Sequence, residues 1–202
     1  MRQVVIIGAG GFGREVAWIC RRANLQVVGF CDDAESLQNG EFDGAPLLGS
    51  IEQAAKVLDG KIGFHCAIGD NRTRQALAGR ALSIGWQPVT VIDPTAVIAE
   101  NAQIGAGSFI GAMAFVAPET VIGRMVLINY HAGVGHGCSV GDFAQLCPGA
   151  RVSGNCRLAE GAMIGSNGVL LPNRSVGAWA TLGASALGVR DVADGETVAR
   201  VR

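Results

Sequence analysis

Two histidines stand close together in the stretch INYHAGVGHGCSVG, which runs from Ile128 to Gly141. They are His131 and His136, and the residues around them follow neither a helical nor an alternating apolar pattern. An imidazole has an ordinary pKa of about 6.5, so it can take a proton from an attacking amine or hydroxyl at neutral pH. The pair can therefore exchange protons near neutral pH, and its role depends on the fold that surrounds it.

A six-residue repeat surrounds these histidines. An aliphatic residue recurs at every sixth position from Ile92 to Leu182, and a second column four residues further on is almost entirely small. Neither the helical period of about 3.6 nor the strand period of about two fits this spacing. A coil of short parallel strands fits it, because three such units make a triangular turn with the aliphatic column inside. We therefore expect a parallel β-helix, in which Cys138 and Cys156 stack as small core residues.

The first ninety residues carry a different pattern. They predict a strand over Gln3–Ile7, a glycine turn, a helix over about Gly11–Arg22 and a strand over Gln26–Cys31. Asp32 and Asp33 follow this second strand directly. This order is typical of the nucleotide-binding unit of a Rossmann-like α/β domain.

The glycine turn fits the pattern G-x-G-x-x-G with Gly8, Gly10 and Gly13. Such glycines let a backbone approach a ligand closely, and the following helix N-terminus favours an anion. A complete dinucleotide site needs two such halves, whereas one more strand, Ile62–Ile68, and two short helices precede the repeat. Half a unit suits a mononucleotide, although a nicotinamide-dependent enzyme stays open at this point.

A second glycine turn lies in AIGDNRTRQAL, from Ala67 to Leu77. The carboxyl ends of neighbouring parallel strands meet at one edge of a sheet, so the two glycine turns should border one crevice. We expect this crevice to be lined by Gly10, Gly11, Phe12, Asp32, Asp33, Gly69 and Asn71.

Composition excludes several classes of protein. The 202 residues carry 16 basic and 17 acidic side chains and a net charge of -1, so the overall charge favours neither nucleic acid nor an anionic membrane as a partner. No apolar run approaches the roughly 20 residues of a membrane span, and the first residues lack a signal-peptide pattern. The six cysteines lack metal-ligand spacing. We therefore expect a cytoplasmic protein with reduced thiols and no metal.

Nearly the whole chain resembles the bacterial sugar acyltransferase family that contains sialic acid O-acetyltransferases and N-acetyltransferases acting on nucleotide-linked 4-amino-sugars. The resemblance is carried by GAGGFGREVA, FCDD, AIGDNRTR, NAQIGAGSFI and VGHGCSVGDF. It implies a Rossmann-like domain that binds a nucleotide sugar over residues 1–90, a left-handed β-helix of hexapeptide repeats over 91–187 and a tail over 188–202. It also implies a homotrimer that moves acetyl from acetyl-CoA to the amino group of a nucleotide-linked amino-sugar in surface glycan biosynthesis.

The same resemblance implies roles for individual residues. His136 matches the family's catalytic histidine and is the expected general base, with His131 as a rival. Gly137 stands where the family has an acidic partner, which Asp142 or a carboxylate of a neighbouring chain could replace. Substrate contacts are implied for Gly10, Gly11, Phe12, Asp32, Asp33, Gly69, Asn129 and His131. Coenzyme A contacts are implied for Gln145, Gly154, Ser166 and Ala184.

Other functions stay open beside this one. One is O-acetylation of a sialic-acid-like sugar. Another is a catalytically eroded protein that binds a sugar nucleotide without turnover, suggested by Gly137 and by the unusual chain end ARVR, Ala199–Arg202. A nicotinamide-dependent enzyme requires NAD to bind the first domain. His65, in GFHCAIG, is expected to be a core or crevice histidine without chemistry.

Overall fold

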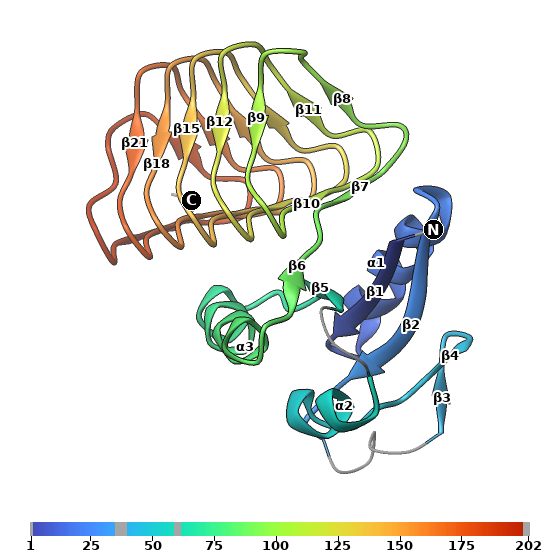
Figure 1. Cartoon of the computed structure of the whole chain (residues 1–202). Coiled ribbons are helices and arrows are strands. Elements are labelled where there is room, and N and C mark those ends of the chain that lie inside the picture. Colours follow the sequence, from blue (N-terminus) through green and yellow to red (C-terminus); the bar gives the residue numbers. More distant parts are fainter. Residues whose placement is uncertain (1, 35–39, 59–61, 200–202) are drawn as a thin grey trace. The chain divides into compact units, whose positions relative to one another are not determined.

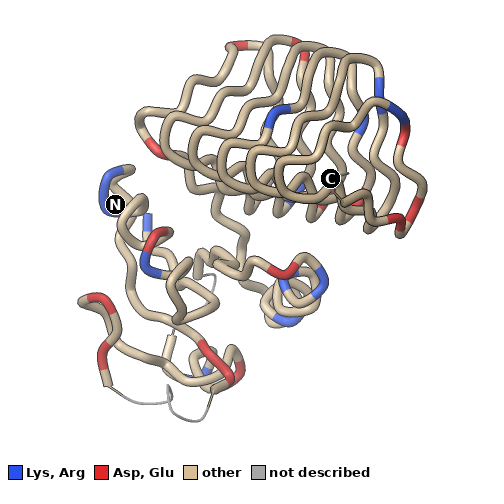
Figure 2. The backbone as a smooth tube through the Cα atoms, turned by 180° about the vertical axis from the view of Figure 1, so that it is seen from behind, with Lys and Arg blue, Asp and Glu red and all other residues tan. Residues whose placement is uncertain are grey.

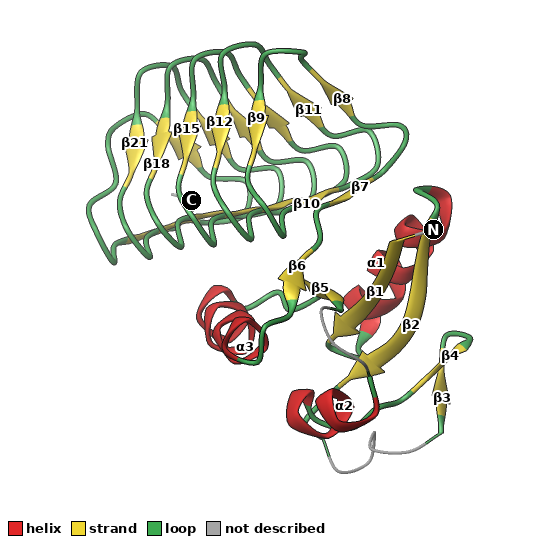
Figure 3. Cartoon of the chain, in the orientation of Figure 1, coloured by secondary structure: helices red, strands yellow, loops and turns green. Residues whose placement is uncertain are grey.

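The structure is a computed structural model that describes residues 2–34, 40–58 and 62–199 (Figure 1). The chain divides into two compact units, one ending at Val91 and the other beginning at Ile92. The described helices all belong to the first unit, and the second is built from strands of two residues joined by turns (Figure 3).

The first unit is built around a parallel sheet with strand order β2-β1-β5-β6. The chain order reverses at β1, which lies between β2 and β5, and this reversal is the switch point where α/β sheets bind ligands. The βαβ arrangement expected from the sequence is confirmed. Its elements are β1 (Arg2–Ile7), α1 (Gly11–Arg22), β2 (Leu25–Cys31), β3 (Glu41–Phe42), β4 (Ala45–Pro46), α2 (Ile51–Val57), β5 (Gly63–Cys66), α3 (Asn71–Ser83) and β6 (Gln87–Pro88).

Apolar burial explains why these residues form this sheet. The end of β1, Val4–Ile7, is wholly buried, as expected for a parallel strand covered on both faces. Helix α1 buries an apolar stripe that includes Val16 and Ile19. A Cβ added to Gly13 would lie 2.2 Å from the carbonyl oxygen of Gly8, so α1 can only pack this closely on β1 with a glycine there.

The second unit is a parallel β-helix with three faces, as the six-residue repeat predicts. The first face holds β7 (Val91–Ile92), β10 (Phe109–Ile110), β13 (Leu127–Ile128), β16 (Gln145–Leu146), β19 (Met163–Ile164), β22 (Thr181–Leu182) and β24 (Thr197–Val198). The second face holds β8 (Val97–Ile98), β11 (Phe115–Val116), β14 (Gly133–Val134), β17 (Arg151–Val152), β20 (Val169–Leu170) and β23 (Leu187–Gly188). The third face holds β9 (Gln103–Ile104), β12 (Val121–Ile122), β15 (Ser139–Val140), β18 (Arg157–Leu158) and β21 (Ser175–Val176).

The second residue of nearly every strand points inward and is the aliphatic residue of the repeat. These side chains form one continuous core along the coil with the small residues of the corners. Cys138 and Cys156 stack there as predicted, and the Cys156 N–H donates to the Cys138 sulfur at 3.3 Å. The fourth residue of each unit has a positive φ, in an unbroken series from Gly107 to Ser185. Asparagine and glycine, which tolerate this conformation best, fill many of these places.

The coil runs further than the repeat suggested. Residues 188–202 were expected to form a tail, but Val192 pairs with Val176 on the third face and β24 pairs with β22 on the first. The inward places pass from Leu182 to Gly188, Val192 and Val198, so one unit has four residues instead of six. Because of this shortened unit, a strict six-residue period does not predict the last turn.

Charged residues are spread thinly along the coil (Figure 2). No helix in the described part of the chain is long and apolar enough to cross a membrane. The six cysteines are all free thiols.

Candidate functional site

The first unit has a pocket of about 250 Å³ at the carboxyl edge of its sheet. Its position at the switch point is the one expected for a ligand of this fold. Most of its walls are apolar, and two carboxylates stand among them. The lining residues are Ile7, Gly8, Cys31, Asp32, Asp33, Ile51, Ile68, Thr73 and Leu77.

Asp32 and Asp33 both line this pocket, as predicted, but each carboxylate already has partners within the chain. Asp32 accepts hydrogen bonds from the N–H groups of Ala9 and Ala34, both at 2.9 Å. It therefore fixes the glycine turn that follows β1. Asp33 instead forms an ion pair with Arg80 of α3, with a shortest distance of 2.6 Å.

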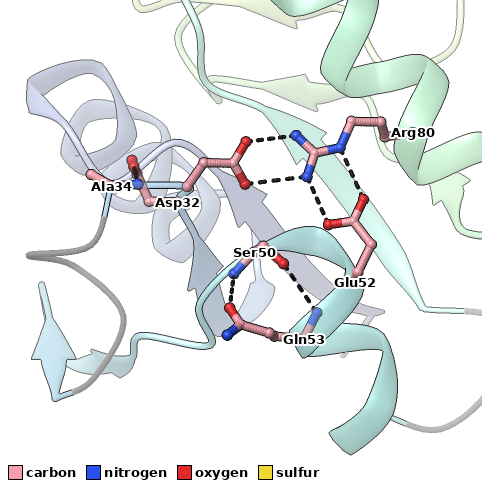
Figure 4. A network of polar contacts seen from close by, with 7 residues as sticks. Asp32, Ala34, Ser50, Glu52, Gln53 and Arg80 are labelled. Carbon is pink, nitrogen blue, oxygen red and sulfur yellow. Dashed lines mark hydrogen bonds and ion pairs between the residues drawn. The ribbon is translucent and has the colours of Figure 1, made fainter.

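Arg80 is shared between two carboxylates, as Figure 4 shows. Its guanidinium binds Asp33 and also Glu52 in the first turn of α2, at 2.7 Å to the Glu52 Oε2. Hydrogen bonds from Arg80 hold the pKa of Glu52 at about 2. The guanidinium thus ties the ends of β2, α2 and α3 together beside the pocket. This contact could not be predicted from the sequence, because the partners lie 28 and 47 residues away from Arg80.

Three predicted glycines leave open space beside the glycine turns. A Cβ added to Gly10, Gly11 or Gly69 would meet no atom within 4 Å, and none of these residues has a positive φ. Neither packing nor backbone strain therefore requires glycine at these places. A ligand that approaches the backbone closely would require it. Phe12 is half-buried in the first turn of α1.

Arg74, which was not among the predicted site residues, holds the turn between β5 and α3 by hydrogen bonds. Arg74 is 1% exposed, and its guanidinium donates to the carbonyl oxygen of Ile68 at 2.9 Å and to the Asn71 Oδ1 at 2.8 Å. The spacing of Asn71 and Arg74 on one helix face was the available signal. Asp70 caps α3 by accepting from the Thr73 N–H at 2.8 Å.

His65 lies in the core, as predicted. It is wholly buried in β5, and its Nδ1 lies 2.9 Å from the carbonyl oxygen of Val89. Burial lowers the pKa of His65 to about 4, so the ring is neutral at physiological pH.

In the second unit, His136 and Gly154 lie one above the other at the corner between the second and third faces. His136 is exposed, and a Cβ added to Gly154 would lie 2.6 Å from its Nε2. The imidazole therefore rests on the backbone of the next coil, in space that only glycine leaves free. The structure brings together the expected general base and one residue expected to contact coenzyme A.

The residue after His136, where an acidic partner was expected, is Gly137. Gly137 has a φ of +64°, and a Cβ there would lie 2.4 Å from the Asn155 Oδ1 of the next coil. Asp142 lies at the corner between the third and first faces and accepts from the Arg124 N–H at 2.7 Å. Asp142 is therefore not the partner of His136. Within residues 92–199, no carboxylate hydrogen-bonds to the His136 ring.

His131 lies at another corner, between the first and second faces, together with three other predicted residues. It is exposed, with a φ of 55°, and its carbonyl oxygen accepts a hydrogen bond from Arg151. The other three are Asn129 on the same coil, Ser166 two coils further on and Ala184 three coils further on, so they lie along one edge of the β-helix.

A groove of about 410 Å³ crosses the outer side of the second face, between these two corners. Gly133 makes room for it, because it has no side chain between Phe115 and Arg151, its neighbours on β11 and β17. Arg151 and Phe115 were not predicted. The groove is lined by Met113, Phe115, His131, Ala132, Gly133, Val134, Gly135, Arg151, Val152 and Ser153.

Gln145 stands apart from both corners. It is on β16 of the first face and only 8% exposed, and its Nε2 donates to the Cys147 sulfur at 3.6 Å. Its buried Oε1 has no hydrogen-bond partner among the described residues. The predicted coenzyme residues thus lie at two corners and on one face. The described residues also hold no group of three histidine, cysteine, aspartate or glutamate residues that could bind a metal ion.

Comparison with protein families matches residues 3–81 to the PglD N-terminal domain. Among curated proteins, the chain is 32% identical over 178 residues to GDP-perosamine N-acetyltransferase of Escherichia coli O157:H7. The match covers 84% of this chain and 79% of that protein.

Solved structures resemble the whole chain. The acetyltransferase domain of PglB from Neisseria gonorrhoeae, in complex with acetyl coenzyme A, is 33% identical with a TM-score of 0.90, over 98% of this chain and 95% of that one. A histidine-to-asparagine mutant of perosamine N-acetyltransferase from Caulobacter crescentus, in complex with CoA and GDP-perosamine, is 28% identical with a TM-score of 0.89, over 98% of this chain and 93% of that one. The similarity therefore spans both units.

Proposed function

The chain belongs to the family of bacterial sugar acyltransferases with a hexapeptide-repeat β-helix, and we propose that it transfers acetyl from acetyl-CoA to the amino group of a nucleotide-linked amino-sugar. The observation that carries this proposal is the similarity over both units to a solved perosamine N-acetyltransferase with CoA and GDP-perosamine bound. The reaction is an acyl transfer without a metal, and acetyl-CoA is its second substrate.

We assign nucleotide-sugar binding to residues 1–90 and acyl transfer to the β-helix. The pocket at the switch point supports the first assignment, because apolar walls suit a base and the open α-carbons of Gly10, Gly11 and Gly69 suit a close ligand. In this proposal Asp32 acts mainly by shaping the glycine turn. Asp33 offers the rim of the pocket a carboxylate that Arg80 partly neutralises.

In the proposed mechanism, His136 is the general base. The neutral amine of the sugar attacks the thioester carbon, His136 accepts the proton that the amine loses, and the carbonyl oxygen takes up the negative charge. The backbone N–H of Gly154 is the proposed donor to that oxygen. The intermediate then expels the thiolate of coenzyme A, which recovers the proton from His136. Asn129, His131, Gln145, Ser166 and Ala184 are proposed contacts to the two substrates.

We further propose that the protein works as a homotrimer in the cytoplasm. Large apolar side chains on the outer side of the second face support an assembly: Val97 is 60% exposed, Phe115 48% and Leu187 54%. A neighbouring chain could also supply the carboxylate that His136 lacks in its own chain.

The test is coenzyme A release from acetyl-CoA over a panel of GDP-, UDP- and dTDP-linked 4-amino-sugars and a free sialic acid, with His136→Ala beside the wild type. We expect turnover of one amino-sugar and a loss of roughly 100-fold or more in the variant. Turnover of the sialic acid alone would replace N- by O-acetylation. Binding without turnover across the panel would favour an eroded binding protein, and undiminished turnover in His136→Ala would move the base to another residue, with His131 tested next.

A further inference from the structure

Arg74 is a buried cation to which the proposed mechanism assigns no role. Its side chain is 1% exposed, and burial lowers its pKa to about 10. Removing a guanidinium from water costs free energy unless its donors are well used. A residue of this kind therefore needs a structural or functional reason.

The contacts of Arg74 give that reason. The Nη1 donates to the carbonyl oxygen of Ile68 at 2.9 Å and approaches that of Gly69 at 3.5 Å. The Nη2 donates to the Asn71 Oδ1 at 2.8 Å. A guanidinium is planar and rigid, so one side chain holds the chain leaving β5 and the start of α3 in a fixed relation.

The turn that Arg74 holds forms one wall of the pocket. The side chain of Ile68 lines the pocket, and its Cδ1 lies 2.7 Å from the place of a Cβ on Gly8. The next residue, Gly69, presents its open α-carbon beside it. A shift of this turn would therefore move Ile68 against the glycine turn of β1 and change the space available to a ligand.

We propose that Arg74 is a positioning residue of the nucleotide-sugar site, which it serves by holding Ile68 and Gly69 in the ligand-accepting form without touching the ligand. This inference rests on the proposed function of the first unit. It predicts a defect in binding the nucleotide sugar and none in the use of acetyl-CoA.

The experiment compares Arg74→Met, which removes the donors, with Arg74→Lys, which keeps the charge but cannot bridge both acceptors. Asn71→Ala removes one acceptor of Arg74 and leaves the arginine in place. It replaces the Arg74 variants in the test if these fail to fold. The matched control is Arg72→Met, which changes an exposed arginine in the same helical turn. Circular dichroism establishes that each variant is folded, and steady-state kinetics give kcat and both KM values on the full chain.

We expect Arg74→Met to raise KM for the nucleotide sugar roughly ten- to hundredfold, with a smaller rise in Arg74→Lys and Asn71→Ala. The kcat and the KM for acetyl-CoA of these variants should stay within about twofold of the wild-type values. In Arg72→Met, kcat and both KM values should stay within the same range. Equal changes in both KM values, or unchanged KM values in folded variants, would overturn the proposal.

Calorimetric titration with GDP, UDP and dTDP separates this inference from the proposed reaction. If the wild type binds one of them but turns over no sugar, a raised Kd in Arg74→Met still supports the positioning role while the acetyl transfer fails. If the wild type binds none of them, or the folded variants bind with the wild-type Kd, the positioning role is wrong.

Discussion

At the scale of single residues, the proposed catalysis depends most on the contact between His136 and Gly154. A methyl group on Gly154 would overlap the imidazole, with its Cβ 2.6 Å from Nε2. The ring must then leave its place, and a displaced general base loses part of its typical 100- to 10,000-fold contribution. We expect Gly154→Ala to lower kcat by about 10- to 100-fold in the coenzyme A release assay.

A double-mutant cycle tests the physical reason for that loss. In a His136→Ala background no ring occupies the space above residue 154, so adding Gly154→Ala should lower the residual rate by less than about twofold. If Gly154→Ala costs the same factor in both backgrounds, the methyl group acts on something other than the imidazole, for example on the oxyanion donor.

His65 gives a second prediction for a single residue, this time for stability. Above about pH 6.5 the ring is neutral in both the folded and the unfolded chain, so it adds no pH dependence. Burial lowers its folded pKa to about 4, so between about pH 6.5 and 4 only the unfolded chain takes the proton. The free energy of unfolding therefore falls as the pH falls through this window, and the loss is complete below about pH 4.

The variant His65→Asn removes the titration and keeps an amide donor near the carbonyl oxygen of Val89. Between about pH 7.5 and 5.0 we expect the wild type to lose about 2 kcal/mol more unfolding free energy than the variant. Urea unfolding at the two pH values measures the difference. An identical loss in both proteins would show that other groups cause the acid sensitivity of the fold.

At the scale of elements, the two glycine turns after β1 and β5 carry the next prediction. Gly10→Ala and Gly69→Ala place a methyl group in space that the protein itself leaves open, so the fold should tolerate both. A ligand against these α-carbons would meet the methyl group, and we expect the Kd for the nucleotide sugar to rise about tenfold or more.

Gly79→Ala in α3 is the matched control for these two variants. Its added Cβ also meets no atom within 4 Å, and Gly79 is exposed on the helix away from the pocket lining. Calorimetric titration should give the wild-type Kd for this variant. Wild-type affinity in Gly10→Ala and Gly69→Ala as well would place the ligand away from the glycine turns.

Regular elements could be predicted from the sequence because their physical causes are local. A strict six-residue period leaves a β-helix as the architecture that buries its aliphatic column, and the glycine turn with its flanking strands indicates a βαβ unit. The last turn could not be predicted because the inward residues Gly188 and Val192 are four positions apart instead of six. Contacts between distant parts of the sequence could not be predicted for another reason. Arg80 pairs with Glu52 and Asp33, which lie 28 and 47 positions away in the sequence, and no local pattern specifies these pairs.

At the scale of the whole molecule, the proposed trimer depends on the outer side of the second face. Phe115 is the outward residue of β11 and is 48% exposed, next to the groove that separates the corners of His131 and His136. A charge there leaves the inward core untouched, but it would be costly to bury against a second chain. We expect Phe115→Glu to dissociate the assembly and, because a neighbouring chain is proposed to supply the carboxylate beside His136, to lower kcat at least tenfold.

Val121→Glu provides the comparison that makes this test specific. Val121 is the outward residue of β12 on the third face and is 46% exposed, so the two substitutions place the same charge in equivalent strand positions on different faces. Light scattering should give the wild-type trimer mass for Val121→Glu and a lower mass for Phe115→Glu. The reverse result would move the interface to the third face, and a monomeric wild type with full activity would mean that one chain alone completes the site. In that case His136 works without a carboxylate partner, because none bonds to its ring among the described residues of the β-helix.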